Sequence, residues 1–439
     1  MPSGRRVAVA AALLAVACGR SSPPAPSPAP ADATAATTDA TAVVAPDSEA
    51  AYAQLLIAAI VRCGGPPALR FDADRHAITD GELRIATPDL YAEYLALPPA
   101  GRARHLEDAA RAFATDRDGP PLREARAQLR PVVRAGVYFD AALTDDAPPG
   151  SPPVALPRRP LGEVTGVGLA FDLPTSMQLV TAGDLVLLGL SFDDALALAI
   201  QHLDATPAPF VELRPGVWTA AANDGYATSR LLLVDPIRRL PLRGAPVALI
   251  PNRDTLLIAG DRDVAALRAI ADLATDAAAA PRAIHTVPLC LRGAAWIDCA
   301  PAPSPAVARQ LRGLATIGRV DVYEAQRPRL QAQLGGDVYV GEASVARHQA
   351  TGAPLSYATW AFGEPTLIPH VDHVGLVAAA TATQPGASLG FVPWERLQRV
   401  LASRLARDDR SPPRWATGTY VPTAAELAAL APTADLPPP

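Results

Sequence analysis

The chain has 439 residues, of which 49% are hydrophobic and 19% are charged, so it is long enough for more than one globular domain. Its formal net charge of -5 argues against nucleic-acid binding, which depends on a dense field of arginine and lysine facing the phosphates. All 39 basic residues are arginine. Without lysine the chain cannot form a P-loop, a lysine Schiff base or a Ser-Lys hydrolase dyad.

The first 18 residues have the pattern of a bacterial export signal. Arg5 and Arg6 precede an apolar run, Val7 to Ala17, which is shorter than the roughly 20 residues that a membrane-spanning helix needs. The segment Leu14-Ala15-Val16-Ala17-Cys18 resembles a lipobox. We therefore expect Cys18 to carry a lipid that holds the protein at a membrane, with its body in the periplasm or at the cell surface. Ordinary cleavage nearby, which would leave Cys18 as a free thiol, is the alternative.

Composition divides the rest of the chain into segments. Residues 19–46 consist almost entirely of Ser, Pro, Ala and Thr, which bury too little apolar area to fold and predict a disordered linker. An alanine run that ends at Pro281 predicts a boundary between two globular units. The expected organisation is a signal peptide at 1–18, a linker at 19–46, a larger domain at 47–276, a smaller domain at 283–432 and a tail at 433–439.

The larger domain is expected to have an α+β fold, with hairpins and packed helices, because its patterns do not alternate as in a βαβ repeat. Asp47 or Ser48 can cap its first helix, and Ser191 with Asp194 forms a capping box before a helix that reaches Leu203. Further helices are expected at 101–115, at 122–135 and from a cap at Asp261 to Ala274. Strands are expected at 68–71, 76–79, 83–86, 168–172, 177–180, 217–221, 229–234, 246–250 and 255–259.

The second, smaller domain is also expected to be α+β. Its expected strands are at 284–290, 320–324, 338–343, 356–360 and 374–379. Its expected helices are at 306–314 and 394–406.

Four segments of the larger domain carry a resemblance to a known family. They are Asp172-Leu-Pro-Thr-Ser-Met177, Gly189-Leu-Ser-Phe-Asp-Asp-Ala195, Asn223-Asp-Gly-Tyr-Ala-Thr-Ser-Arg-Leu-Leu-Leu233 and Ile250-Pro-Asn-Arg-Asp-Thr-Leu-Leu257. In this order they resemble the YtpQ-like family, a bacterial domain of unknown function, over about residues 47–275. The resemblance implies a mixed α and β fold and carries no assigned activity.

Two turns within these segments carry more polar groups than their backbones require. A minimal hairpin turn needs only Asn-Gly or Asp-Gly, so Tyr226, Arg230 and Arg253 are surplus to the turn chemistry. We expect the two turns to lie side by side and to present a common ligand site made of Asn223, Asp224, Tyr226, Asn252, Arg253 and Asp254. Alanine at Asp224 and Arg253 is then expected to abolish binding with little loss of stability. The structural alternative is that these side chains pair within their own turns and strands.

Other candidate sites have simpler explanations. His370, Asp372 and His373 are metal-binding residue types, but residues three apart on a strand face opposite sides, and no further ligand stands nearby, so we expect no metal and no cofactor. Cys63, at the end of a helix, fits a small core residue better than a nucleophile. Cys290 and Cys299 are expected either to form a disulfide across a hairpin or to remain two reduced thiols.

No hydrolase elbow, dinucleotide fingerprint or zincin helix motif is present in the sequence. The first functional hypothesis is therefore a binding or interaction module at a membrane surface, whose partner is an unknown protein or small molecule. The second is a hydrolase or other enzyme with an unrecognised site in the larger domain.

Overall fold

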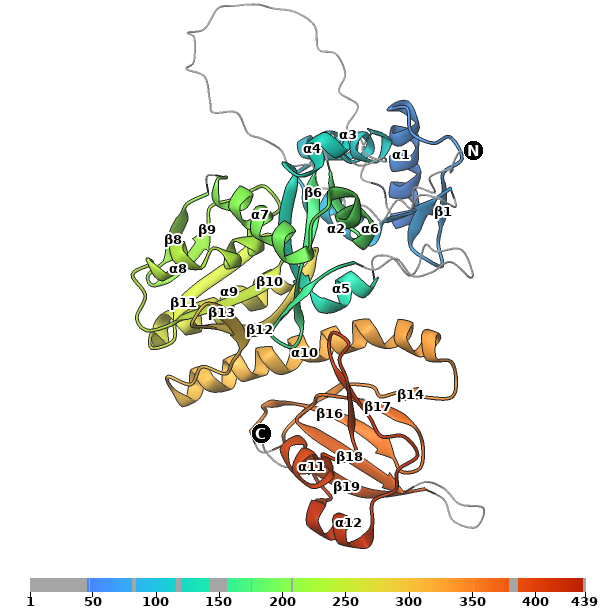
Figure 1. The fold of residues 1–439 in the computed structure, drawn as a ribbon, viewed down its shortest axis with the longest axis vertical. Helices are drawn as coiled ribbons and strands as arrows, with labels where there is room; N and C mark the ends of the chain where they lie inside the picture. The colour runs from blue at the N-terminus through green and yellow to red at the C-terminus, as the bar shows by residue number, and fades with distance from the viewer. Residues whose placement is uncertain are drawn as a thin grey trace, which may run out of the picture.

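The structure is a computed structural model that describes residues 46, 48–80, 84–115, 120–141, 156–174, 176–206, 208–349, 351–378 and 386–436. The predicted signal peptide, the lipidation site Cys18 and nearly all of the predicted linker lie outside these residues. The described chain has an α+β fold. N-terminal helices and a central pair of sheets lie on one side of the long helix α10 (Pro305–Leu334), and a C-terminal part lies on the other (Figure 1).

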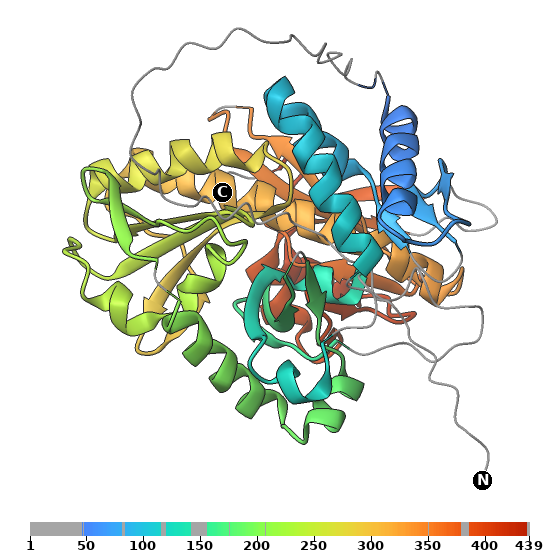
Figure 2. The same ribbon diagram turned by 90° about the horizontal axis from the view of Figure 1, so that it is seen from above.

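The N-terminal part is a small unit of helices and one antiparallel sheet. Of the two candidate caps, Ser48 begins the first helix, because its side chain accepts a hydrogen bond from the Ala51 amide at 3.2 Å. The core of this unit is aromatic, with Tyr52, Tyr94 and Phe113 fully buried. Seen from above, α1 and α3 lie side by side (Figure 2). The elements are α1 (Glu49–Arg62), β1 (Arg70–Asp72), β2 (Ala77–Thr79), β3 (Arg84–Ala86), α2 (Pro88–Ala96) and α3 (Pro99–Thr115).

The helix expected at 122–135 is wrong over most of its length. Only α4 (Leu122–Ala125) is helical, and β4 (Leu129–Ala135) is a strand. Val132 and Val133 are both fully buried, which suits β-branched residues in a strand covered on both faces. This strand joins an antiparallel sheet in which β6 pairs with β4, β5 and β7. The remaining elements here are α5 (Gly136–Ala141), β5 (Arg159–Leu161), β6 (Thr165–Asp172) and β7 (Met177–Leu179).

The central six-stranded sheet has the order β13-β12-β10-β11-β9-β8. The hairpin expected around residues 251–254 is present as β10 and β11, which pair antiparallel. The strand expected at 229–234 is wrong, because these residues form a buried 3-10 turn and the start of α8. The elements are α6 (Ala182–Leu188), α7 (Phe192–Asp204), β8 (Phe210–Arg214), β9 (Val217–Ala220), α8 (Val234–Arg238), β10 (Pro246–Asn252), β11 (Thr255–Gly260), α9 (Val264–Ala278), β12 (Ala283–Arg292) and β13 (Ala295–Asp298).

The same sheet crosses the domain boundary that was expected between residues 276 and 283. Strand β12 follows that boundary but pairs with β10, so it belongs to the central sheet. The physical reason is burial: Ile284, Val287 and Leu289 enter the same core as residues of β4 and β6, and a strand that is apolar on both faces needs the interior of a sheet.

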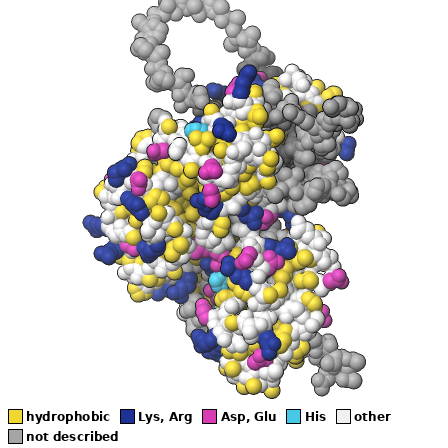
Figure 3. Space-filling model, in the orientation of Figure 1, with side chains coloured by type: hydrophobic (Ala, Val, Ile, Leu, Met, Phe, Trp, Pro, Cys, Tyr) yellow, Lys and Arg dark blue, Asp and Glu magenta, His cyan; other side chains and the backbone are white. Residues whose placement is uncertain are grey.

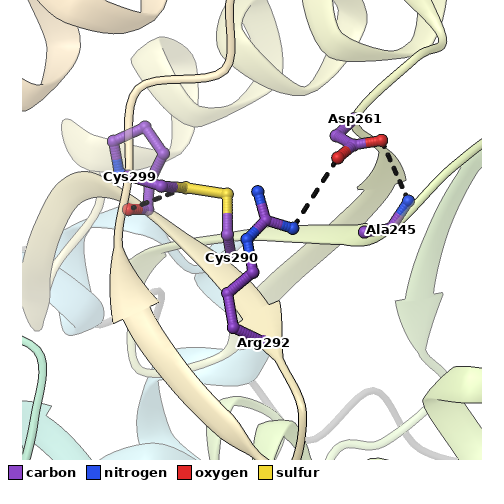
Figure 4. The surroundings of a disulfide bond; sticks show 6 residues. Ala245, Asp261, Cys290, Arg292 and Cys299 are labelled. Atoms are coloured by element: carbon purple, nitrogen blue, oxygen red, sulfur yellow. Dashed lines mark hydrogen bonds and ion pairs between the residues drawn. A yellow bond between two sulfur atoms is a disulfide. The ribbon is translucent and has the colours of Figure 1, made fainter.

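Cys290 of β12 and Cys299 form a disulfide, with an S–S distance of 2.05 Å and Cα atoms 5.8 Å apart. Figure 4 shows Arg292 reaching toward Asp261 beside this bond, at 3.7 Å, while Asp261 also accepts a hydrogen bond from the Ala245 amide. Of the two expected alternatives, a disulfide or two reduced thiols, the structure therefore has the disulfide.

Helix α10 (Pro305–Leu334) replaces the shorter helix and the strand expected at 306–314 and 320–324. The valines have helical spacing. Val320 and Tyr323, three positions apart, pack into the C-terminal core, whereas Val322 packs into the core of the central sheets. On a strand, Val320 and Val322 would share one face. Near its start, Val307 and Leu311 pack against the central sheet, and near its end Leu330 packs into the C-terminal part, so the helix connects the two halves of the molecule (Figure 1).

The C-terminal part contains two four-stranded sheets, with the orders β15-β16-β18-β19 and β14-β17-β21-β20. The expected tail is partly wrong, because Thr433 pairs with Phe391 of β19 through two backbone hydrogen bonds. The elements are β14 (Tyr339–Val340), β15 (Ser344–Arg347), β16 (Pro354–Ala361), β17 (Thr366–Pro369), β18 (His373–Ala378), β19 (Ala387–Pro393), α11 (Trp394–Leu401), β20 (Ala406–Asp408), β21 (Arg414–Ala416) and α12 (Ala424–Leu430).

Charged side chains of both signs gather where the C-terminal part meets the rest of the molecule (Figure 3). The Glu163 carboxylate, in the β5–β6 turn, lies 2.8 Å from Nδ1 of His370 and accepts a hydrogen bond from the Tyr323 hydroxyl at 2.9 Å. Burial alone would raise the pKa of Glu163, but these partners and Arg319 lower it. Glu163 is therefore ionised, and its contacts with Tyr323 and His370 link the central sheets to the C-terminal part.

Candidate ligand-binding pocket

A pocket of about 730 Å³ opens beside the sheet formed by β4, β5, β6 and β7. Two of the four segments quoted above from the sequence meet there, namely 172–177 at the β6–β7 turn and 223–226 after β9. Strand β4, the end of α7 and helix α3 complete the wall. The lining residues are Arg104, Gln128, Arg130, Asp172, Leu173, Pro174, Ser176, Met177, Leu203, Thr206, Asn223, Asp224, Gly225 and Tyr226.

Asp224 is fixed by a buried arginine behind the pocket wall. Arg230 is only 1% exposed and donates two hydrogen bonds to the Asp224 carboxylate, at 3.0 and 2.7 Å. The Tyr226 amide donates a third to Oδ1 at 3.0 Å across Gly225, whose φ of +77° needs glycine. Burial would raise the pKa of Asp224, but these hydrogen bonds outweigh it and lower the pKa. Asp224 is therefore ionised at neutral pH.

Asp172, the last residue of β6, links the two segments that resemble the family. The Tyr226 hydroxyl donates to its Oδ1 at 3.0 Å, and Nε of Arg130 lies 3.9 Å from its Oδ2. The Asp172 amide donates to the Gln128 carbonyl at 2.8 Å, which holds β6 against the start of β4. Asp172 is thus held by Tyr226 and Arg130 of the same wall, whereas Asp224 is held from behind by Arg230.

The remaining lining combines apolar and hydrogen-bonding groups. Leu173 and Leu203 are buried, Met177 is half-buried and Asn223 is exposed at the rim. Oε1 of Gln128 is buried and, among the residues that the structure describes, has no hydrogen-bond partner. A buried acceptor without a partner is costly, so this oxygen is a natural contact for a donor group of a ligand.

The two polar turns lie at the same end of the central sheet, as expected. Strands β9 and β11 are antiparallel, so the end of one adjoins the start of the other. The hydroxyl of Thr228, just beyond the first turn, donates to the carbonyl of Arg253 in the second turn at 3.2 Å. The two turns are therefore adjacent, and the contact between them involves the backbone of the second turn and not its side chains.

The second turn does not open onto the pocket. Arg253 is only 5% exposed and donates to the Asp254 carboxylate at 2.9 and 2.7 Å. Asn252 donates from Nδ2 to the Ala277 carbonyl and accepts the Asp254 amide. Arg253 and Asp254 thus pair within their own turn, as the structural alternative to a ligand site predicted. The expectation that alanine at Asp224 and Arg253 leaves stability intact stays a prediction. The structure argues against it for Asp224, which pairs with the buried guanidinium of Arg230.

The histidines, Asp372 and Cys63, which are metal-binding or nucleophilic residue types, form no metal site in the described residues. His373 is buried, and Asp372 accepts hydrogen bonds from the amide and hydroxyl of Ser356 at 2.7 and 2.8 Å. Within the described ranges, no three His, Cys, Asp or Glu side chains are placed to hold a metal ion. Cys63 is exposed at the end of α1, so its expected core position is wrong. None of the helices in the described part of the chain has the length and apolar character to cross a bilayer.

Sequence reasoning missed Gln128 and Arg130 as pocket residues, because it placed them in a helix. The signal against that helix is Pro131, which would lie in its interior, where proline removes a hydrogen bond and clashes with the preceding turn. Reading 129–135 as a strand would have placed Gln128 and Arg130 at a strand start. Thr206 and Arg104 have no comparable signal, because only the tertiary packing of α7 and α3 brings them to the pocket.

The resemblance to the YtpQ-like family stays a prediction from its four segments. No protein-family model, no curated protein and no solved structure matches this chain.

Proposed function

We propose that the protein is a binding module, tethered to a membrane by a lipid on Cys18, that holds a small molecule in the pocket between residues 172–177 and 223–226. The observation that carries the proposal is the convergence of these two segments on one pocket, where Tyr226 holds Asp172 and the buried Arg230 holds Asp224. Asp224 is held ionised by Arg230, so it is suited to accept hydrogen bonds and not to donate a proton. Such a wall recognises a ligand by shape and hydrogen bonding.

The pocket's size and lining support a small ligand of mixed character. Its volume of about 730 Å³ falls within the range of small-molecule sites. Asp172, Tyr226 and Gln128 offer hydrogen-bonding groups, whereas Met177 and Leu203 offer apolar surface. The ligand that fits this lining has both hydrogen-bonding groups and apolar surface.

Two features support a position outside the cytoplasm. The lipobox-like segment ending at Cys18 and the linker at 19–46 form a coherent tether. The disulfide between Cys290 and Cys299 is of a kind that persists in oxidising compartments. Both favour a lipid-anchored body in the periplasm or at the cell surface.

Native mass spectrometry of the full-length protein extracted from membranes tests this function. The native protein is expected to carry a small-molecule adduct, and Asn223→Trp, which places an indole at the pocket rim, is expected to lose it. Arg239→Trp, at an exposed position outside the pocket lining, is the matched control and keeps the adduct. Retention of the adduct by Asn223→Trp contradicts the site.

Membrane fractionation tests the tether separately. Cys18→Ala is expected to move the protein from the membrane fraction to the soluble fraction with its adduct intact. Equal membrane partitioning of both proteins refutes the lipid anchor. Chemical conversion of the bound molecule during incubation would instead favour the enzyme hypothesis.

A further inference from the structure

A cluster of buried arginines lies where the N-terminal helices meet the central sheets. Arg134 of β4, Arg253 of the β10–β11 turn and Arg282 before β12 are 8%, 5% and 6% exposed. Hydrogen bonds link the segments that carry these arginines. The Val133 amide donates to the Ser229 hydroxyl at 3.3 Å, and the hydroxyl of the adjacent Thr228 donates to the Arg253 carbonyl at 3.2 Å. The Arg253 amide donates to the Arg282 carbonyl at 3.0 Å.

Two of the three guanidinium groups have carboxylate partners. Glu93 of α2 accepts hydrogen bonds from Nε and Nη2 of Arg282. Asp89, also on α2, acts on Arg282 as well. Asp254 accepts two hydrogen bonds from Arg253, and its side chain is 53% exposed, so water weakens its hold on the buried guanidinium.

Arg134 has no such partner. Among the described residues it forms no ion pair, and its one hydrogen bond runs from Nη1 to the Val133 carbonyl at 2.7 Å. Its guanidinium lies 5.9 Å from the centre of the Tyr138 ring. Burial lowers the pKa of Arg134 to about 10, and the positive charges of Arg253 and Arg282 add to this effect.

Arg253 supplies the second, independent observation. Its Nη1 is buried and has no hydrogen-bond partner within the described part of the chain. A buried guanidinium is normally paired or fully hydrogen-bonded, because an unpaired buried charge is expensive. The cluster therefore has one buried cation without a carboxylate and one unused donor on a neighbouring cation.

We propose that Arg134 and Arg253 bind a small oxyanion, the phosphate or carboxylate group of a ligand, at this junction. Guanidinium groups are suited to this task, because their donors form a rigid fork that matches both kinds of oxyanion. This site is separate from the pocket at 223–226 and does not depend on it. It also gives Arg253 a binding role that its own turn does not explain.

Isothermal titration of the full-length protein with inorganic phosphate and with sodium acetate, at constant ionic strength, tests the proposal. Saturable binding of at least one anion is expected, with a rise in Tm over the same concentration range. The tighter of the two anions identifies the phosphate or the carboxylate class. Arg134→Met is expected to weaken binding by at least about 30-fold, because a buried charge partner is lost.

The control is Arg123→Met, which removes an arginine whose side chain is 83% exposed and is expected to bind as the native protein does. Phosphate stabilises many proteins by exclusion from their surfaces, so a rise in Tm that is equal in Arg134→Met counts against the site. If Arg134→Met does not fold, Arg134→Lys keeps the charge, loses the fork and is expected to bind more weakly. Absence of binding to the native protein, or equal binding by the folded variant, overturns the proposal.

Discussion

Asp224→Ala is expected to destabilise the protein strongly, although Asp224 lies in a turn beside a pocket. The substitution removes both hydrogen bonds to Arg230, whose guanidinium is 1% exposed, and the acceptor of the Tyr226 amide. Loss of one partner of a buried ion pair costs about 3–5 kcal/mol. Because the Asp224 side chain is 32% exposed, we expect the lower end of this range, about 3 kcal/mol.

Urea unfolding followed by tryptophan fluorescence measures this loss as a change in the free energy of unfolding. Asp193→Ala is the control, since Asp193 is 76% exposed and pairs with Arg159 at 2.5 Å. An exposed pair of this kind contributes at most about 1 kcal/mol. The double variant Asp224→Asn with Arg230→Met is expected to be more stable than Asp224→Ala, because it leaves no unpaired buried charge.

The pH dependence gives a second measurement. The pKa of Asp224 is lowered in the folded state, so its contribution is complete above the unfolded value of about 3.9 and is lost as the pH falls through the lower folded value. The difference between native protein and Asp224→Ala should therefore be constant near neutral pH and shrink below about pH 4. A loss no larger than that of Asp193→Ala would refute the structural role of the pair.

Further predictions concern the disulfide and the charged junction. Cys290→Ala with Cys299→Ala, which opens a loop with a sequence separation of 9, is expected to lower stability by about 2–3 kcal/mol in urea titrations, and an unchanged midpoint would contradict this. Burial raises the pKa of Asp298, so its charge opposes folding as the pH rises from the unfolded value of about 3.9 to the higher folded value, above which the loss is complete. Asp298→Asn should therefore gain stability relative to the native protein as the pH rises above about 4 in thermal melts, whereas parallel profiles would refute it. Tyr323→Phe removes hydrogen bonds to Glu163 and to the Pro413 carbonyl and is expected to cost about 1–3 kcal/mol, with an unchanged Tm as the contrary result.

The predictions from sequence that the structure confirms rest on local chemistry. Ser48 caps α1, Ser191 caps α7, and the β10–β11 hairpin surrounds the expected turn. Each of these depends on residues only a few positions apart, whose hydrogen bonds and backbone angles are decided within the segment. The α+β fold class follows from such local patterns in sum.

The errors in element type lie where an apolar run suits both a helix and a strand. Residues 129–135 and 320–324 are each rich in valine, yet the first is a strand and the second is part of α10. The neighbours decide, because β4 pairs with β6 whereas Val322 and Tyr323 pack into separate cores. A short buried run has no periodicity of its own to choose between them.

The sequence by itself determined that residues 223–226 and 252–254 are polar turns with more donors and acceptors than turns need. Only the tertiary structure decided which of them faces a pocket. Tyr226 meets Asp172, which precedes it by about 50 positions, and Asp224 lines the same pocket, whereas Arg253 is buried near Arg134 and Arg282. Burial and the choice of charge partner are properties of the packed chain, because they depend on which distant segments exclude water from the same place.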